Sequence, residues 1–233
     1  MRYLAIGNNA KTIKSDRGGE YLTAILYLRP DDDLCAMSRL AQCQAPCLNM
    51  AGRGAFSNVQ QARAAKTEAF KRDPVAFVDA IAADIRIALR KADRQAVRLA
   101  VRLNGTSDIA WENMRGGDGK TLFEQFPDVQ FYDYTKLPGR KVPANYHLTV
   151  SYSGANPAYA RKALGALDHG RNVAVVFDTA RGAPLPLFWG GARVIDGDLT
   201  DLRFTDPANV VVGLRAKGPA RADVSGFVVR LGA

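Results

Sequence analysis

Residues 96–103 read AVRLAVRL, with valine and leucine at every second position. Because successive side chains of a strand point to opposite faces, this period of two predicts a β-strand. One face would carry Val97, Leu99, Val101 and Leu103, and the other would carry the arginines. A helical stripe precedes the strand, since Val78, Ile81, Ile85 and Leu89 recur at helical spacing after Asp73-Pro74. This part of the chain therefore predicts a helix packed on a strand.

The same alternation of strand and helix extends in both directions. An S-x-x-Q sequence at Ser57 favours the start of a helix that runs to about Arg72. A short helix is expected around 122–126, and Asn156-Pro157 predicts one that ends near Gly170. The other predicted strands are 21–28, 129–135, 146–153, 172–177, 209–217 and, closing the chain, 226–231. This order predicts an α/β fold: a single domain over 1–233, built as a partial (β/α) barrel of mostly parallel strands with helices outside.

Several predicted strands have one polar face. His147, Ser151 and Ser153 share a face of the strand 146–153, and Arg215 and Lys217 share one in 209–217. In a barrel these side chains, with Arg102 and Asn104, would line a shared cavity suited to a ligand. The alternative is a set of antiparallel strands with one face in water.

Polar residues also follow the ends of predicted strands, where the active sites of parallel barrels lie. The sequence NGTSD supplies such a group, and so does the end of 129–135. A turn followed by a helix-capping aspartate would explain NGTSD equally well. In IDGDLTDLRFTDP, the carboxylates are expected to pair with Arg203 or to bind a ribose. The candidate binding residues are Asn104, Thr106, Ser107, Asp108, Asp133, Thr135, Lys136 and Asp198.

Charge and composition narrow the class of protein. The formal net charge of +9 suits an anionic partner such as a nucleotide or nucleic acid, although a basic surface without a partner would look the same. No apolar run is long enough to span a membrane, and no signal peptide is evident at the N-terminus. We therefore expect no membrane partner and a cytoplasmic location. The sequence leaves the oligomeric state open.

All the cysteines of the chain lie in CAMSRLAQCQAPC, residues 35–47. Thiolates are ligands for iron–sulfur clusters and zinc, so Cys35, Cys43 and Cys47 are a candidate metal site. A cluster held by three cysteines would leave one iron open. Structural zinc would need a fourth ligand, for which His147 is a candidate. The third possibility is plain thiols that bind no metal.

The chain resembles the phage "gene product 88" family. The matching segments follow one another in the family's order: GNNAKTIK (7–14), ILYL (25–28), the cysteine segment with CLNMAGRG (47–54), VRLNGTSDIAWE (101–112), FYDYTK (131–136), YHLTVSYSGAN (146–156), IDGD (195–198), DLRFTDP (201–207) and VGLRAKG (212–218). This resemblance implies a phage or mobile-element protein and no particular reaction.

A second resemblance is to radical S-adenosylmethionine enzymes. In those partial barrels, three cysteines after the first strand hold a [4Fe–4S] cluster. Here the cysteines also follow the first clear strand, although the spacing is C-x7-C-x3-C instead of C-x3-C-x2-C. The resemblance implies a [4Fe–4S] cluster and S-adenosylmethionine as cofactors.

These observations favour an iron–sulfur enzyme of radical S-adenosylmethionine type that acts on a nucleotide or nucleic acid. No catalytic acid or base can be named from the sequence. One alternative is a phage accessory protein that binds nucleic acid without catalysis. In that protein, zinc bound by the cysteines would stabilise the cysteine loop. Another is a metal-free hydrolase or transferase that uses Asp108 and Asp133.

Overall fold

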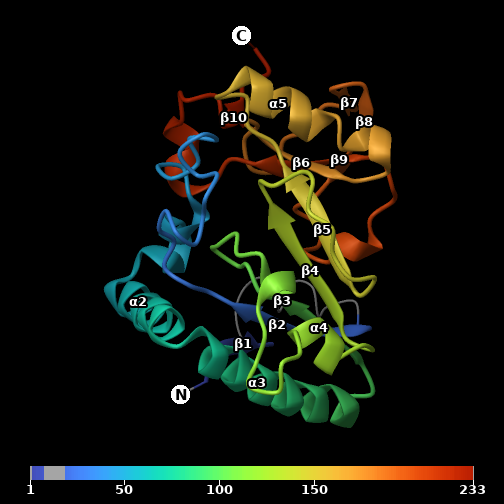
Figure 1. Cartoon of the computed structure of the whole chain (residues 1–233). Helices are drawn as coiled ribbons and strands as arrows, with labels where there is room; N and C mark the ends of the chain where they lie inside the picture. The colour runs from blue at the N-terminus through green and yellow to red at the C-terminus, as the bar shows by residue number, and fades with distance from the viewer. Residues whose placement is uncertain (1, 8–18, 233) are drawn as a thin grey trace. The chain divides into compact units, whose positions relative to one another are not determined.

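The structure is a computed structural model that describes residues 2–7 and 19–232 (Figure 1). The chain divides into two compact units. Unit 1 comprises residues 1–30, 57–133 and 141–147, and unit 2 comprises 31–56, 134–140 and 148–233. Positions 8–14 of the GNNAKTIK segment lie outside the described residues. The single domain predicted from the sequence stays a prediction.

Unit 1 contains a mixed sheet in the order β1-β2-β3-β4. Strand β1 is antiparallel to β2, with Leu4 opposite Leu26, whereas β2, β3 and β4 are parallel neighbours. The chain passes between the two units within β4 and again within β5. The strands are β1 (Leu4–Ile6), β2 (Tyr21–Leu26), β3 (Arg98–Arg102) and β4 (Gln130–Thr135). The helices are α2 (Ser57–Arg72), α3 (Pro74–Arg94) and α4 (Leu122–Gln125).

Helix α3 forms where its sequence predicts it. The side chain of Asp73 accepts a hydrogen bond from the backbone N–H of Ala76 at 2.9 Å, which caps the first turn, and Pro74 follows at a position that needs no donor. Val78, Ile81 and Ile85 are fully buried in the stripe that contacts β2 and β3. Figure 1 shows α2 and α3 following one another along this unit.

Unit 2 contains a second set of strands in the order β5-β6-β9-β8-β7. Strands β5, β6, β9 and β8 are parallel, and β7 is antiparallel to β8. The other edge of β6 is shared, because β5 pairs with its first residues and β10 with its last. The bounds are β5 (Tyr146–Ser151), β6 (Val173–Phe177), β7 (Phe188–Trp189), β8 (Ala192–Asp196), β9 (Val211–Arg215) and β10 (Val228–Val229).

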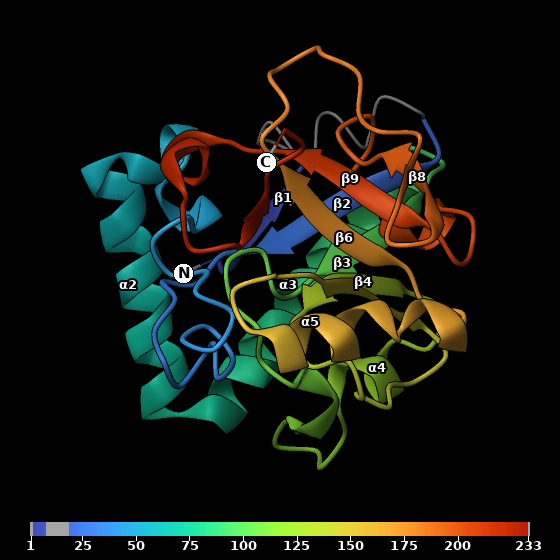
Figure 2. The same ribbon diagram turned by 90° about the horizontal axis from the view of Figure 1, so that it is seen from above.

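Helix α5 (Pro157–Leu164) packs on the strands of unit 2 (Figure 2). Its buried Tyr159 and Ala163 belong to one apolar cluster with Val150, Val173 and Val175. The same cluster includes Ala41 from the cysteine segment, so this segment is anchored to the core of unit 2. The 3-10 helices are η1 (Leu48–Met50), η2 (Gly52–Ala55), η3 (Trp111–Asn113), η4 (Leu167–His169), η5 (Arg203–Thr205) and η6 (Gly218–Ala222).

The observed elements confirm a mixed α/β protein with mostly parallel strands. Closure of these strands into a partial barrel stays a prediction. Within the described residues, no helix is both long and apolar enough to cross a membrane.

Candidate functional site

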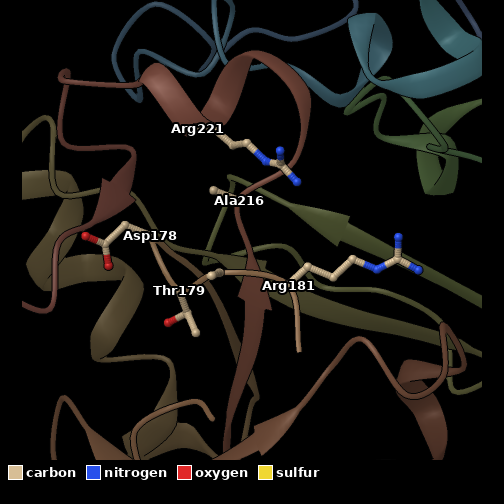
Figure 3. Close-up of a pocket in the computed structure, with 6 residues that line it drawn as sticks. Asp178, Thr179, Arg181, Ala216 and Arg221 are labelled. Carbon is tan, nitrogen blue, oxygen red and sulfur yellow. The ribbon is translucent and has the colours of Figure 1, made fainter. Parts of the chain in front are cut away.

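A pocket lies in unit 2 at the carboxyl ends of two parallel strands (Figure 3). It has a volume of about 370 Å³. Four of its lining residues directly follow β6, one directly follows β9, and one belongs to η6. The lining residues are Asp178, Thr179, Ala180, Arg181, Ala216 and Arg221. Figure 2 shows β6 and β9 running side by side in the same direction, so the residues that follow them emerge at one edge.

Backbone pairing fixes this edge. Val176 of β6 is opposite Leu214 of β9, and the N–H of Ala216 continues the ladder to the carbonyl oxygen of Phe177 at 2.9 Å. On the other edge of β6, the N–H of Asp178 donates to Val229 at 3.0 Å. The end of β6 is therefore hydrogen-bonded on both edges, to β9 and to β10, at the point where the pocket loop begins.

The pocket presents cationic groups that have no partner in the part of the chain that the structure describes. Within the described residues, the guanidinium groups of Arg181 and Arg221 form no hydrogen bond or ion pair. The same holds for the backbone N–H groups of Thr179, Ala180 and Arg181. Guanidinium groups and successive backbone N–H groups are the donors that bind phosphate and other oxyanions.

A network of charged side chains holds the pocket loop at Ala183. Arg215 donates from Nε and Nη2 to the carbonyl oxygen of Ala183, at 3.0 and 2.7 Å. Its Nη1 contacts Asp196 at 2.9 Å and Asp198 at 3.1 Å, and Lys217 also donates to Asp198. Burial acts to raise the pKa of Asp198, but the hydrogen bonds and charges of Lys217 and Arg215 outweigh it, so this pKa lies below its usual value.

This network accounts for three of the residues predicted from the sequence as ligand-binding. Asp198, Arg215 and Lys217 are brought together, as expected for neighbouring strand ends, and they contact one another. Arg215 holds the loop 178–187 through Ala183, and Asp198 in turn contacts Arg215. The expected pairing of an aspartate with Arg203 is confirmed for Asp206, which lies 3.3 Å from the Arg203 guanidinium.

The NGTSD loop is organised by its own asparagine. The side-chain oxygen of Asn104 accepts from Ser107 at 2.9 Å, from the Ile109 N–H at 2.9 Å and from the Trp111 indole at 3.1 Å. Thr106 donates to the carbonyl oxygen of Leu28. A Cβ at Gly105 would lie 2.5 Å from the carbonyl oxygen of Leu26, so only glycine fits there.

Asp133 supports this loop from the neighbouring strand. Its carboxylate accepts from the backbone N–H groups of Leu103 and Asn104, at 3.2 and 2.8 Å, and from the Tyr146 hydroxyl at 2.9 Å. Nε of Arg102 lies 3.6 Å away in a fully buried ion pair. Asn104 and Asp133 thus have structural partners in unit 1. Ligand binding by these residues and by Asp108 stays a prediction.

Four further candidates lie in unit 2: Thr135, Lys136, Ser151 and Ser153. Nζ of Lys136 donates to the Ser151 hydroxyl at 2.7 Å and lies 4.8 Å from the centre of the Phe227 ring. Thr135 is buried and accepts from Arg140 at 3.3 Å. Ser153, also buried, donates to Ala41 at 2.7 Å and so ties the cysteine segment to the end of β5.

The cavity predicted from strand parity would combine residues of both units. Arg102, Asn104 and His147 belong to unit 1, whereas Ser151, Arg215 and Lys217 belong to unit 2. His147 is half-buried on β5. The shared cavity therefore stays a prediction, and the pocket in unit 2 is described by its own lining residues.

Each of the three cysteines has contacts of its own. Cys43 packs at the margin of the apolar cluster of unit 2, and its thiol donates to the carbonyl oxygen of Ser38 at 3.8 Å. The sulfur of Cys47 accepts the N–H of Asn49 at 3.4 Å and caps η1. The backbone N–H of Cys35 donates to Asp31 at 3.0 Å.

A metal bound by all three cysteines requires their sulfurs to meet at one point. Across residues 2–7 and 19–232, no three Cys, His, Asp or Glu side chains gather into a group that could hold a metal ion. A three-cysteine iron–sulfur or zinc site therefore gains no support within the described residues. It stays a prediction, and no step of a reaction is derived from it. The predicted resemblance to radical S-adenosylmethionine enzymes, which depends on that site, gains no support.

Sequence reasoning missed the residues that line the pocket. The signal was present, because DTAR at 178–181 directly follows a predicted apolar strand, just as NGTSD follows another. Arg221 gave no such signal. It lies in η6, and only the fold brings it to the loop after β6.

Comparison with known proteins identifies the family of the chain. A search of curated proteins found no match, and a search of solved structures found none either. The model of the family described as gene product 88 matches residues 3–231. That match covers nearly the whole chain, so this protein belongs to the gene product 88 family.

Proposed function

We propose that this protein binds the phosphate groups of a nucleotide or a nucleic acid in the pocket at the ends of β6 and β9. One observation carries the proposal. Arg181 and Arg221 reach the same pocket from different segments, and neither guanidinium has an ion-pair partner among the described residues. Both arginines are exposed, so two guanidinium groups at one concave site are available to bind an anion.

The position and size of the pocket agree with this proposal. In open α/β sheets, ligands bind outside the carboxyl ends of parallel strands. The volume of about 370 Å³ is within the range of small-molecule sites. The net charge of +9 would attract an anionic ligand over a longer distance.

The donors are suited to phosphate in particular. A guanidinium presents two parallel N–H groups that match two oxygens of one phosphate. The N–H groups of Thr179, Ala180 and Arg181 add donors from the backbone of the loop. A phosphate between the two arginines would therefore satisfy groups that the protein leaves available.

Isothermal titration calorimetry with inorganic pyrophosphate tests the proposal. The Arg181→Gln, Arg221→Gln double variant should bind at least about tenfold more weakly than the wild type, because each charge-assisted hydrogen bond contributes roughly 1.5–3 kcal/mol. The matched control is Arg161→Gln, Arg193→Gln, which removes the same charge from exposed positions outside the pocket. An equal loss of affinity in both variants would show a diffuse charge effect and would refute the pocket.

A salt titration distinguishes a nucleotide from a nucleic acid strand. Binding of a single-stranded oligonucleotide that contacts many phosphates should weaken steeply between about 50 and 200 mM salt. Binding of a mononucleotide held by two arginines should weaken much less. Whether binding leads to catalysis is tested separately, by looking for turnover of the bound compound.

A further inference from the structure

The pocket has two chemically different ends. In Figure 3 the side chains of Arg181 and Arg221 extend to the same side, and the carboxylate of Asp178 points the opposite way. Within the described residues, Asp178 forms no ion pair with either of these arginines, and its cationic neighbour is Arg230 at 4.0 Å. The residues that line the pocket therefore carry guanidinium groups on one side and a carboxylate on the other.

The carboxylate of Asp178 is held in place and still has acceptor capacity. Its Oδ1 accepts the N–H of Leu231 at 3.2 Å, and its Oδ2 faces Arg230 at the limit of an ion pair. A carboxylate offers about four lone-pair sites, so these two contacts do not saturate it. The side chain is 29% exposed, which leaves it accessible to a ligand.

A phosphate alone is a poor fit to this end of the pocket. Phosphate at neutral pH brings negative charge and acceptor oxygens, and a carboxylate beside it would repel it. The complement of a carboxylate is a group that donates hydrogen bonds. The two hydroxyls of a ribose are such donors, and a carboxylate that accepts from ribose is a known way for α/β folds to hold a nucleotide.

We propose that the ligand is a ribonucleotide, with its phosphates at Arg181 and Arg221 and its ribose hydroxyls donating to Asp178. This inference rests on the proposed function and adds the sugar to it. The pocket then selects ribonucleotides over nucleotides that lack the 2′ and 3′ hydroxyls.

The test compares four kinds of probe by calorimetry on the full chain: each of the four ribonucleoside diphosphates, its 2′,3′-dideoxy counterpart, inorganic pyrophosphate and phosphoethanolamine. The wild type should bind at least one ribonucleoside diphosphate about tenfold or more tightly than its dideoxy form. Asp178→Asn keeps the shape and the acceptor for Leu231 but removes the charge. It should reduce that ratio to about twofold, and its affinity for pyrophosphate should stay equal or rise because a repulsion is lost.

Asp168→Asn is the matched control, since it removes one exposed carboxylate outside the pocket. It should leave the ratio unchanged.

Equal wild-type affinity for the ribose and dideoxy forms would overturn the ribose inference while leaving phosphate binding intact. Failure of every probe, pyrophosphate included, would overturn the proposed function itself. Tighter binding of phosphoethanolamine than of any ribonucleotide would assign Asp178 to an amine and would also contradict the inference. The ribose-to-dideoxy ratio of the wild type needs no variant, so the test stands even if Asp178→Asn does not fold.

Discussion

Arg215 donates two hydrogen bonds to the carbonyl oxygen of Ala183, at 3.0 Å from Nε and 2.7 Å from Nη2. Ala183 lies two residues after Arg181. The guanidinium of Arg215 in β9 therefore holds the loop just beyond its pocket-lining residues. The side chain of Arg215 is only 11% exposed, and its hydrogen bond to Asp196 helps to raise its pKa. This geometry makes Arg215 a positioning residue for the proposed phosphate site.

The first prediction follows from this contact. Arg215→Lys keeps the charge but cannot donate from two planar nitrogens to Ala183 while also reaching Asp196. We expect the free energy of unfolding to fall by about 1–3 kcal/mol and the affinity for pyrophosphate to fall several-fold. Chemical denaturation and calorimetry measure the two effects.

Lys217→Gln provides the comparison, because Lys217 is mostly exposed and contacts Asp198 from the surface. Such a surface ion pair contributes little, so this variant should change stability by less than about 1 kcal/mol. If Arg215→Lys changed stability and affinity as little as Lys217→Gln does, Arg215 would not be a positioning residue for the loop.

The second prediction concerns the buried hydroxyl of Thr179. Its Oγ1 is shielded from solvent and makes no hydrogen bond among the described residues. Replacing it by the methyl group of valine removes an unsatisfied polar atom, so Thr179→Val should raise the free energy of unfolding by about 1 kcal/mol. Pyrophosphate affinity should not change, because the shielded hydroxyl is not a ligand contact. A variant with unchanged stability and weaker binding would place the hydroxyl in the site instead.

Much of the fold was predictable because each strand carries a strong local signal. The expected strands 172–177 and 209–217 contain β6 and β9, and the expected closing strand 226–231 contains β10. Strands β1, β7 and β8 were missed. With three and two residues, β1 and β7 are too short to show a period of two, and their pairing partners define them.

The candidate site was harder to predict, for a physical reason. Polar residues at a strand end look alike in sequence whether they bind a ligand or one another. Asn104 and Arg215 are engaged with their own neighbours, whereas Arg181 is not. Which side chains remain available depends on partners that are distant in sequence, such as Ala183 for Arg215.

The third prediction separates the roles of the cysteines. Cys43 packs against the apolar cluster of unit 2, so Cys43→Ser should cost about 1–3 kcal/mol by burying a more polar group. Cys47 caps a 3-10 turn through its sulfur, a role that serine fills well, so Cys47→Ser should be nearly neutral. Thermal melts of the two variants measure the difference.

Metal analysis of protein purified without oxygen completes this test. If all three cysteines bound one iron–sulfur cluster or one zinc ion, each serine variant would lose metal and stability to a similar extent. Unequal effects in the direction given above, with no stoichiometric metal in the wild type, would agree with the different contacts of Cys43 and Cys47. Stoichiometric iron and sulfide would contradict them.

The last prediction concerns the buried pair Arg203 and Asp206. Their side chains are 0% and 7% exposed, and the 3.3 Å contact between them lacks hydrogen-bond geometry. Burial raises the pKa of Asp206 from 3.8 to about 6, although Arg203 acts to lower it and Asp201 adds a smaller upward effect. The folded state therefore holds a proton that the unfolded state releases at lower pH. This contribution to stability is complete below about pH 4 and is lost as pH rises through about 6.

Asp206→Asn removes the titration. Its free energy of unfolding should match the wild type near pH 4 and exceed it near pH 7 by up to about 3 kcal/mol, which is the value of this shift. Denaturation curves of both proteins at pH 4, 5, 6 and 7 measure this difference in the free energy of unfolding. If Asp206→Asn were the less stable protein at pH 7, the attraction to Arg203 would outweigh the burial of the carboxylate, and the raised pKa would be wrong.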